Sequence, residues 1–202
     1  MSALFPIAYF GSISYYKDLV AQTDIVLEVH EHFVKQSVRN RTRILTANGM
    51  QELSVPIIKP NGSKTVTKDI LVSSTKDWRK DHWRALESAY KHAAFFEHYG
   101  EEVKALIYQD TPDLVGFNMQ ILASIQQWLQ LPLAISCSSE FTSVTSMDTD
   151  YRFGYTAHPY QQEYPYFQVF QDKQAFVGDL SILDAIFNLG PMARTLFIPR
   201  ES

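Results

Sequence analysis

The stretches that decide the fold are Leu4-Phe-Pro-Ile-Ala-Tyr-Phe-Gly-Ser12 and Ile25-Val-Leu-Glu-Val-His30. The first is apolar and aromatic as far as Phe10, after which Gly11-Ser12 interrupts it with residues typical of a turn. Apolar residues then recur at helical spacing up to Val20, and the second apolar stretch predicts a buried strand. Strand, helix and strand in immediate succession predict a βαβ unit, whose two strands pair in parallel through a right-handed crossover.

Gly11 and Ser12 are a first candidate for binding an anion. In a βαβ unit they lie at the carboxyl end of the first strand and at the amino end of the helix. Free backbone N–H groups and the helix dipole favour negative charge at that place. The same pair is also an ordinary turn followed by an N-cap, and the sequence leaves both interpretations open.

Around this unit the sequence predicts a hairpin and several helices. Asn48-Gly49 supplies the positive φ of a tight turn between strands at 43–46 and 53–58, which places Pro56 at an edge or near a strand end. Further strands are predicted at 64–72, 133–137 and 167–170, and helices at 74–99, 101–108, 111–128 and 180–189. These elements predict one α/β domain spanning residues 1–202, with a mostly parallel sheet, an inserted β-hairpin and flanking helices. An α+β arrangement is the alternative.

Composition narrows the class of protein. The 202 residues carry a net charge of −4, so the chain as a whole gives no electrostatic reason to expect a nucleic-acid partner. Cys137 is the single cysteine, which excludes an intramolecular disulfide and leaves too few thiols for a structural zinc site. We find neither a long uncharged apolar run nor a signal-peptide pattern, and therefore expect a cytoplasmic protein without a membrane span.

The most unusual local feature is a basic segment between Phe33 and Ile44 of this acidic chain. Its four cations share odd numbering with one serine, so in an extended segment all five side chains would point to one face. Guanidinium groups bind phosphate or carboxylate oxygens bidentately, and an anionic small molecule would relieve the mutual repulsion of the row. The alternative is a solvated edge strand whose charges prevent edge-to-edge pairing. The five residues are Lys35, Ser37, Arg39, Arg41 and Arg43.

Histidines are the candidates for moving a proton. His30 and His32 flank Glu31, and on a strand both imidazoles would face the same side, beside the basic row. No third ligand is fixed by spacing, so we predict acid or base catalysis by one of them and no metal site. His82 lies on the inward edge of its predicted helix, where it is either a core residue or a ligand contact. Ser181 and Asp184 have the spacing of a capping box.

Several blocks of the sequence resemble the WbqC-like family of bacterial proteins, in particular its compact form from Bacteroidetes. The most specific are Lys35-Gln-Ser-Val-Arg-Asn-Arg41 and Leu180-Ser-Ile-Leu-Asp184, and Asp150-Tyr-Arg152 also matches. The resemblance implies an association with cell-surface glycan loci and transfer of a small group, such as an aminoacyl unit, onto a sugar. Longer members carry an extra glycine-containing segment where this chain has only residues 143–162.

Together, these observations favour a transferase that acts on a phosphorylated or nucleotide-linked small molecule, a sugar destined for surface glycan. His30 or His32 would move a proton, while the cofactor and the oligomeric state are left open. The alternative function is a non-catalytic module that binds a partner through the aromatic-rich region 151–170. The candidate substrate-binding residues are Lys35, Ser37, Arg39, Asn40, Arg41, Arg43 and His82.

Overall fold

The computed structural model describes residues 2–75, 77–143, 149–153, 155 and 165–197. Its largest sheet contains β1 (Ser2–Pro6), β2 (Asp24–Glu28), β7 (Ile135–Cys137) and β8 (Thr149–Asp150), in the order β7-β2-β1-β8. All three strand pairings are parallel, and α1 (Ile13–Val20) connects β1 to β2. The predicted βαβ unit is therefore confirmed, and the fold is α/β with a mostly parallel sheet.

The two central strands end earlier than predicted. β1 stops at Pro6, after which the chain leaves the sheet and the Tyr9 N–H donates to the Val38 carbonyl at 2.9 Å. Phe10 has a φ of 42°, a backbone conformation that no strand residue adopts. β2 stops at Glu28, so His30 lies beyond the strand.

The inserted hairpin is confirmed. β3 (Arg41–Thr46) pairs antiparallel with β4 (Gly49–Ser54), and Gly49 has the positive φ that the turn requires. The second predicted arm ends at Ser54 because the opposite segment turns at residues 38–40, and a separate short pair follows, β5 (Ile57–Ile58) with β6 (Leu71–Val72).

The predicted strand over 64–72 is wrong in its first two thirds. Two 3₁₀ turns, η1 (Gly62–Lys64) and η2 (Thr67–Asp69), occupy most of it. Within η2 the Asp69 N–H bonds locally to the Val66 carbonyl, while the Thr67 and Lys68 N–H groups donate to the Glu31 and Val29 carbonyls, so no regular strand ladder forms here. The predicted strand at 167–170 is also wrong, because this segment forms turns in which the Gln171 N–H donates to the Gln168 carbonyl.

The long helix predicted over 74–99 is two helices, α2 (Trp78–Tyr90) and α3 (Phe96–Tyr108). The break arises because the Phe95 N–H bonds to the Phe187 carbonyl of another helix, and Gly100 lies inside α3 and does not end a helix. Asp77 is the N-cap residue of α2 and makes no side-chain cap bond, so the helix begins four residues later than predicted. Asp113 caps α4 (Leu114–Leu129) by accepting from the Gly116 N–H.

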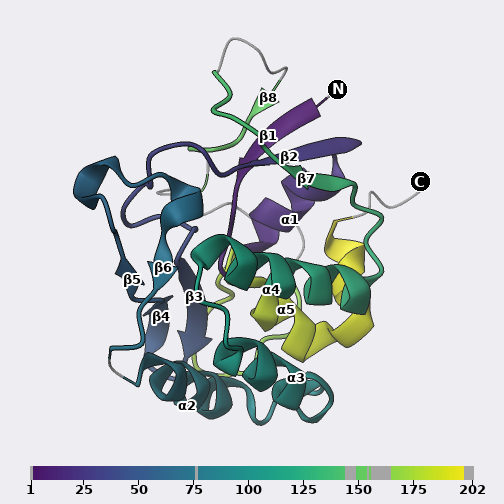
Figure 1. The fold of residues 1–202 in the computed structure, drawn as a ribbon. Helices are drawn as coiled ribbons and strands as arrows, with labels where there is room; N and C mark the ends of the chain where they lie inside the picture. Colours follow the sequence, from purple (N-terminus) through teal and green to yellow (C-terminus); the bar gives the residue numbers. More distant parts are fainter. Residues whose placement is uncertain (1, 76, 144–148, 154, 156–164, 198–202) are drawn as a thin grey trace.

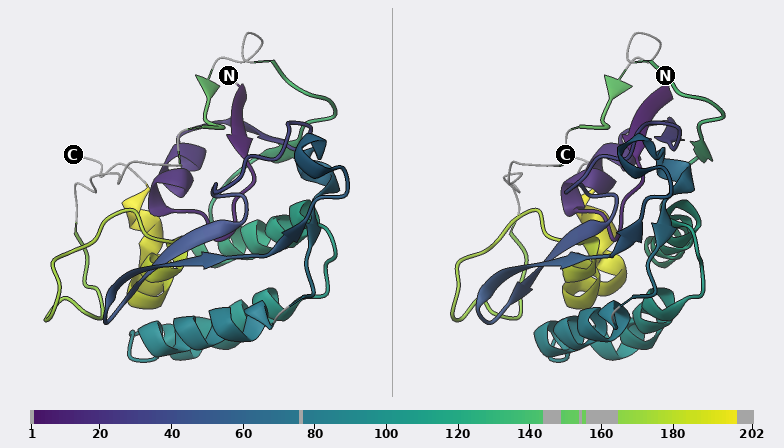
Figure 2. Two further views of the ribbon diagram at one scale, coloured as in Figure 1. Left: turned by 90° about the vertical axis from the view of Figure 1, so that its left-hand side faces the viewer. Right: turned by 60° about the vertical axis from the view of Figure 1, so that its left-hand side comes forward.

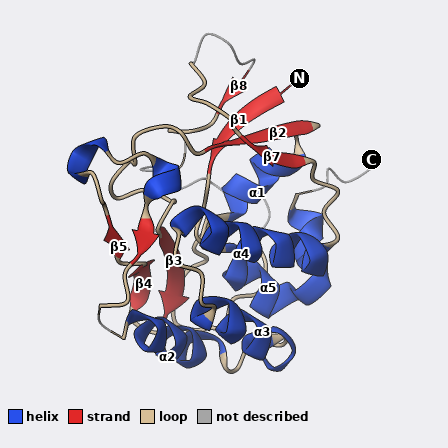
Figure 3. Ribbon diagram, viewed as in Figure 1, coloured by secondary structure: helices blue, strands red, loops and turns tan. Residues whose placement is uncertain are grey.

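The helices enclose the core between the sheet and the hairpin. Figures 1 and 2 show the parallel sheet at one end of the molecule, α2 and α3 at the other, and the hairpin between them. Figure 3 shows how the helices gather below the sheet. α5 (Ile182–Leu189) is buried on nearly all sides, ends at Gly190 with a φ of 56°, and is followed by η4 (Gly190–Leu196). Apart from Asp184 and Asn188 the residues of α5 are apolar, as expected for a helix buried on nearly all sides.

Within the ranges that the structure describes, no helix combines the length and apolar character needed to cross a membrane.

Candidate functional site

The basic segment is not an extended strand. Residues 35–40 form turns, Gln36 has a φ of 53°, and the Ser37 hydroxyl donates back to the Val34 carbonyl at 2.8 Å. Only from Arg41 onward is the chain a strand. The prediction that all five odd-numbered side chains share one face is therefore wrong, although Arg41 and Arg43 do share one.

Arg39 points into the protein. Its side chain is fully buried, and Nε donates to Glu31 Oε1 at 2.8 Å, with a second bond from the terminal nitrogen to the same oxygen. Burial raises the pKa of Glu31 and lowers that of Arg39, while the attraction between the two opposes both changes. The backbone carbonyl of Arg39 accepts from the Asn118 amide at 2.8 Å. This residue fixes the loop and lines neither of the two pockets described next.

Three of the cations near the segment line one pocket, which we call the basic pocket. Its positive side chains are Lys35, Arg41 and Lys59, and no Asp or Glu is among its lining residues. The Lys59 ammonium lies 4.7 Å from the centroid of the Phe33 ring. Desolvation, together with the charge of Lys35, lowers the pKa of Lys59. The full lining is Phe33, Lys35, Gln36, Asn40, Arg41, Ile57 and Lys59.

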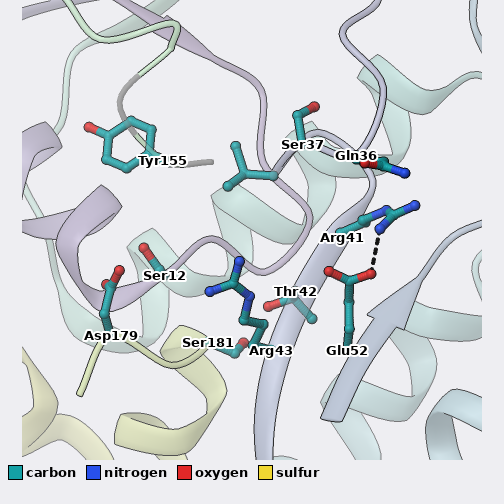
Figure 4. A pocket seen from close by; sticks show the side chains of 11 residues that line it. Ser12, Gln36, Ser37, Arg41, Thr42, Arg43, Glu52, Tyr155, Asp179 and Ser181 are labelled. Atoms are coloured by element: carbon teal, nitrogen blue, oxygen red, sulfur yellow. Dashed lines mark hydrogen bonds and ion pairs between the residues drawn. The ribbon is translucent and has the colours of Figure 1, made fainter. Parts of the chain in front are cut away.

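A second pocket, which we call the hydroxyl pocket, lies between the hairpin, the start of α1 and the segment before α5. Figure 4 shows the Arg43 guanidinium inside it, between Ser12 and the Arg41–Glu52 pair. The charges of its lining sum formally to zero, since the lining contains two arginines and the two carboxylates of Glu52 and Asp179. The lining is Ser12, Gln36, Ser37, Val38, Arg41, Thr42, Arg43, Glu52, Tyr155, Asp179 and Ser181.

Arg41 and Gln36 line both pockets, so the pockets are neighbours. Arg41 Nη1 donates to Glu52 Oε1 at 2.6 Å, and this ion pair is partly exposed to solvent. The Nε–H of Arg41 is buried and has no acceptor among the described residues. One guanidinium thus belongs to two pockets and leaves part of its hydrogen-bonding capacity unused.

The three predicted histidines lie outside both pockets. His30 Nδ1 is 3.2 Å from the Ser138 hydroxyl, and exposed His32 has Nδ1 3.1 Å from the Lys64 carbonyl. His82 is buried, with Nδ1 2.9 Å from the Tyr9 hydroxyl, and burial lowers its pKa to about 4. None of the three therefore lines a pocket with the cations, and His82 lies in the core.

Sequence reasoning missed a buried charged cluster at the carboxyl ends of β2 and β8. Arg152 donates from Nε and its terminal nitrogen to the two oxygens of Asp150, at 3.0 and 2.8 Å, and lies 3.8 Å from Glu28. It also donates to the Thr142 carbonyl, which ties the loop after β7 to the sheet. The only signal for this cluster was the block Asp150-Tyr-Arg152 in the family resemblance.

Lys59 and Glu52 were also missed as lining residues. Nothing in the sequence sets Lys59 apart. Glu52 could have been found, because the register of the predicted hairpin places it directly opposite Arg43.

The predicted capping box at α5 is half right. The Ser181 hydroxyl accepts from the Leu183 N–H, as an N-cap does. Asp184 has a different role, because its buried carboxylate accepts from the hydroxyls of Tyr90 and Tyr166 and from the amide of Gln168, at 2.9, 2.5 and 2.9 Å. Burial raises its pKa. It joins α5 to α2 and to the segment around residue 168.

In the part of the chain that the structure describes, no three His, Cys, Asp or Glu side chains gather as a metal ion would require.

The fold and these pockets define an α/β protein with two polar pockets that meet at Arg41. The chain belongs to the WbqC-like protein family, whose model matches residues 7–158. This confirms the family resemblance seen in the sequence.

The chain is also similar to "Uncharacterized protein Rv1507c" of Mycobacterium tuberculosis (strain ATCC 25618 / H37Rv). The two are 26% identical over 207 residues, which cover 88% of this chain and 89% of the relative. No solved structure gives a significant match.

Proposed function

We propose that the protein is a transferase acting on a phosphorylated or nucleotide-linked small molecule, a sugar used in cell-surface glycan biosynthesis. The observation that carries this proposal is the basic pocket, where Lys35, Arg41 and Lys59 converge without an acidic neighbour in the lining. Membership in the WbqC-like family supports the glycan context. The hydroxyl pocket adjoins the basic pocket, and two neighbouring pockets favour a transfer reaction between two ligands over the binding of a single ligand.

The charge of the basic pocket favours a phosphate group. Like charges held close together raise the free energy of the empty pocket, and the lowered pKa of Lys59 reflects both its desolvation and the charge of Lys35. A phosphate oxygen accepts charge-assisted hydrogen bonds from lysine and arginine alike, and it replaces repulsion by attraction. The amides of Gln36 and Asn40, which also line the pocket, can orient the rest of the ligand.

The predicted binding residues divide between the two pockets and the core. Lys35, Asn40 and Arg41 line the basic pocket, while Ser37 and Arg43 line the hydroxyl pocket. Arg39 and His82 support the fold from the interior. The acid–base role of His30 and His32 stays a prediction. The single Cys137 fits the proposed cytoplasmic location, since free thiols persist in a reducing compartment.

Binding of small anions tests this function. In a thermal-shift screen of inorganic phosphate, pyrophosphate, nucleoside diphosphates and nucleotide-sugars, the compounds that bind should raise the melting temperature of the protein. A ligand at about 100 times its dissociation constant adds roughly 2.7 kcal/mol to the native state. Pyrophosphate affinity should fall at least about tenfold in the double variant Lys35→Gln, Lys59→Gln. Lys91→Gln, which removes an exposed lysine outside both pockets, should change nothing. Equal affinities in all three proteins would refute the proposal.

A second candidate function is supported by an aromatic surface feature. Phe141 and Phe153 are exposed, and their ring centroids lie 5.6 and 5.7 Å from the guanidinium carbon of Arg152. Exposed aromatic side chains are common anchors for partner proteins. If the protein is a binding module, Phe141→Ser with Phe153→Ser should abolish partner capture, and the Lys35→Gln, Lys59→Gln variant should retain it.

A further inference from the structure

Three charged side chains share one face of the hairpin. Arg43 is directly opposite Glu52 in the β3–β4 register, and Arg41 lies two residues from Arg43. Alternate residues of a strand point to the same side, and the side chains of opposed or diagonal residues reach one another. Glu52 is therefore within reach of either arginine.

In the structure Glu52 pairs with the diagonal neighbour. Its carboxylate accepts from Arg41 at 2.6 Å, while Arg43 extends into the hydroxyl pocket (Figure 4) and has no ion-pair partner among the described residues. The buried Nε–H of Arg41 lacks an acceptor in this arrangement. An anion in the basic pocket would offer Arg41 new acceptors, and Arg43 is placed to attract the Glu52 carboxylate once it is released.

Beside the N–H donors of Arg41, Arg43 and Gln36, the hydroxyl pocket offers hydrogen-bond acceptors. The Ser37 hydroxyl donates its proton to the Val34 carbonyl, and the Thr42 and Ser181 hydroxyls both donate to the Phe10 carbonyl. A hydroxyl has one proton to give, so these three have only lone pairs left for a ligand. Together with the carboxylates of Glu52 and Asp179 they suit a molecule that carries O–H or N–H donors.

We propose that the hydroxyl pocket is the site of a second substrate bearing hydroxyl or amino groups, and that Glu52 couples it to the basic pocket. An anion bound by Lys35, Lys59 and Arg41 displaces Glu52 from Arg41. The freed carboxylate moves toward Arg43 and accepts a hydrogen bond from the second substrate. The anionic substrate therefore binds first and completes the second site. This inference rests on the proposed function for the role of the basic pocket.

A double-mutant cycle with pyrophosphate tests the coupling. Titration calorimetry would compare the wild type with Arg41→Gln, Glu52→Gln and the double variant. Glu52→Gln should bind pyrophosphate about two- to fivefold more tightly, because a partly exposed ion pair that competes with the ligand has been removed. In the Arg41→Gln background the same change should have no effect. Glu87→Gln, on the exposed side of α2, removes one negative charge elsewhere and is the matched control.

The outcomes separate this inference from the proposed function. If pyrophosphate does not bind, or binds independently of Lys35 and Lys59, the proposed function fails. If it binds through those lysines and Glu52→Gln has no more effect than Glu87→Gln, the proposed function stands and the coupling is refuted.

The second substrate is probed with glucose, titrated in the absence and in the presence of saturating pyrophosphate. Glucose should bind the wild type at least about fivefold more tightly when pyrophosphate is present, and Arg43→Gln should abolish that difference. Equal glucose affinities of the wild type under the two conditions would show that the anion does not complete the second site and would overturn this assignment.

Discussion

Arg39 and Glu31 form an ion pair in the interior, with Nε 2.8 Å from Oε1 and both side chains almost without solvent exposure. The same basic segment supplies Arg41, whose pair with Glu52 is partly exposed. Two arginines that are neighbours in one sequence block therefore have opposite roles. One holds the loop in place and the other lines two pockets.

The first prediction compares these two arginines. Arg39→Ala should lower the free energy of unfolding by about 3–5 kcal/mol, because it leaves the Glu31 carboxylate buried without its partner. Arg41→Ala should lower it by less than about 1 kcal/mol, since its pair is partly exposed. Urea denaturation followed by tryptophan fluorescence measures both values. A nearly neutral Arg39→Ala would mean that the buried pair does not hold the loop.

The second prediction concerns pH. Burial lowers the pKa of His82 to about 4 in the folded protein, against 6.5 for an unperturbed histidine. The unfolded chain then binds more protons between these values, so stability is complete above pH 6.5 and is lost as pH falls toward 4. The loss is roughly 2–4 kcal/mol. The free energy of unfolding, measured by denaturation at several pH values in this range, should depend less on pH in His82→Gln than in the wild type. The exposed His92→Gln variant should behave like the wild type.

The third prediction concerns the carboxylate inside α5. Asp184→Asn should destabilise the protein by about 1–3 kcal/mol, because an amide nitrogen would face groups that donate to the carboxylate, among them the hydroxyls of Tyr90 and Tyr166. Ser181→Ala should cost about 0.5–2 kcal/mol through loss of the cap. Thermal unfolding of both variants checks this. A wild-type melting temperature for Asp184→Asn would show that the three bonds do not stabilise the fold.

The fourth prediction concerns the geometry of Arg41. Arg41→Lys keeps the charge but removes the planar fork, so pyrophosphate affinity should fall about tenfold. Affinity should also decrease with added salt in the wild type, since mobile ions screen the pocket's charges. Calorimetric titrations at two ionic strengths measure both effects. Unchanged affinity in Arg41→Lys would indicate that charge alone holds the anion.

The fifth prediction concerns the proton carrier. If His30 or His32 fills this role, replacing it by alanine should lower turnover of the donor identified in the ligand screen by about 10²–10⁴-fold. Pyrophosphate affinity should stay unchanged, because neither residue lines the basic pocket. A variant that keeps wild-type turnover removes that histidine from the reaction.

The sequence by itself was sufficient for the elements whose residues carry strong local signals. The apolar runs around Phe5 and Leu27 and the turn at Asn48-Gly49 specified the parallel pair and the hairpin, and the helix predicted over 180–189 ends where α5 ends. Each of these signals acts within a few residues of the chain. Periodicity could not locate the break after α2, because it depends on a hydrogen bond from Phe95 to Phe187, a partner that is remote in sequence.

The candidate site was only partly predictable for the same physical reason. The block from Lys35 to Arg43 identified two of the three cations of the basic pocket and missed Lys59. Alternation along a strand applies only where the chain is extended, and here it turns between Lys35 and Asn40. Which cation is buried and which faces a pocket depended on where Glu31 and Glu52 lie after folding. Local residue patterns therefore determined the strands and the turn of the hairpin. The tertiary structure decided whether each charged side chain points into the core or into a pocket, because that orientation is set by partners brought together only by packing.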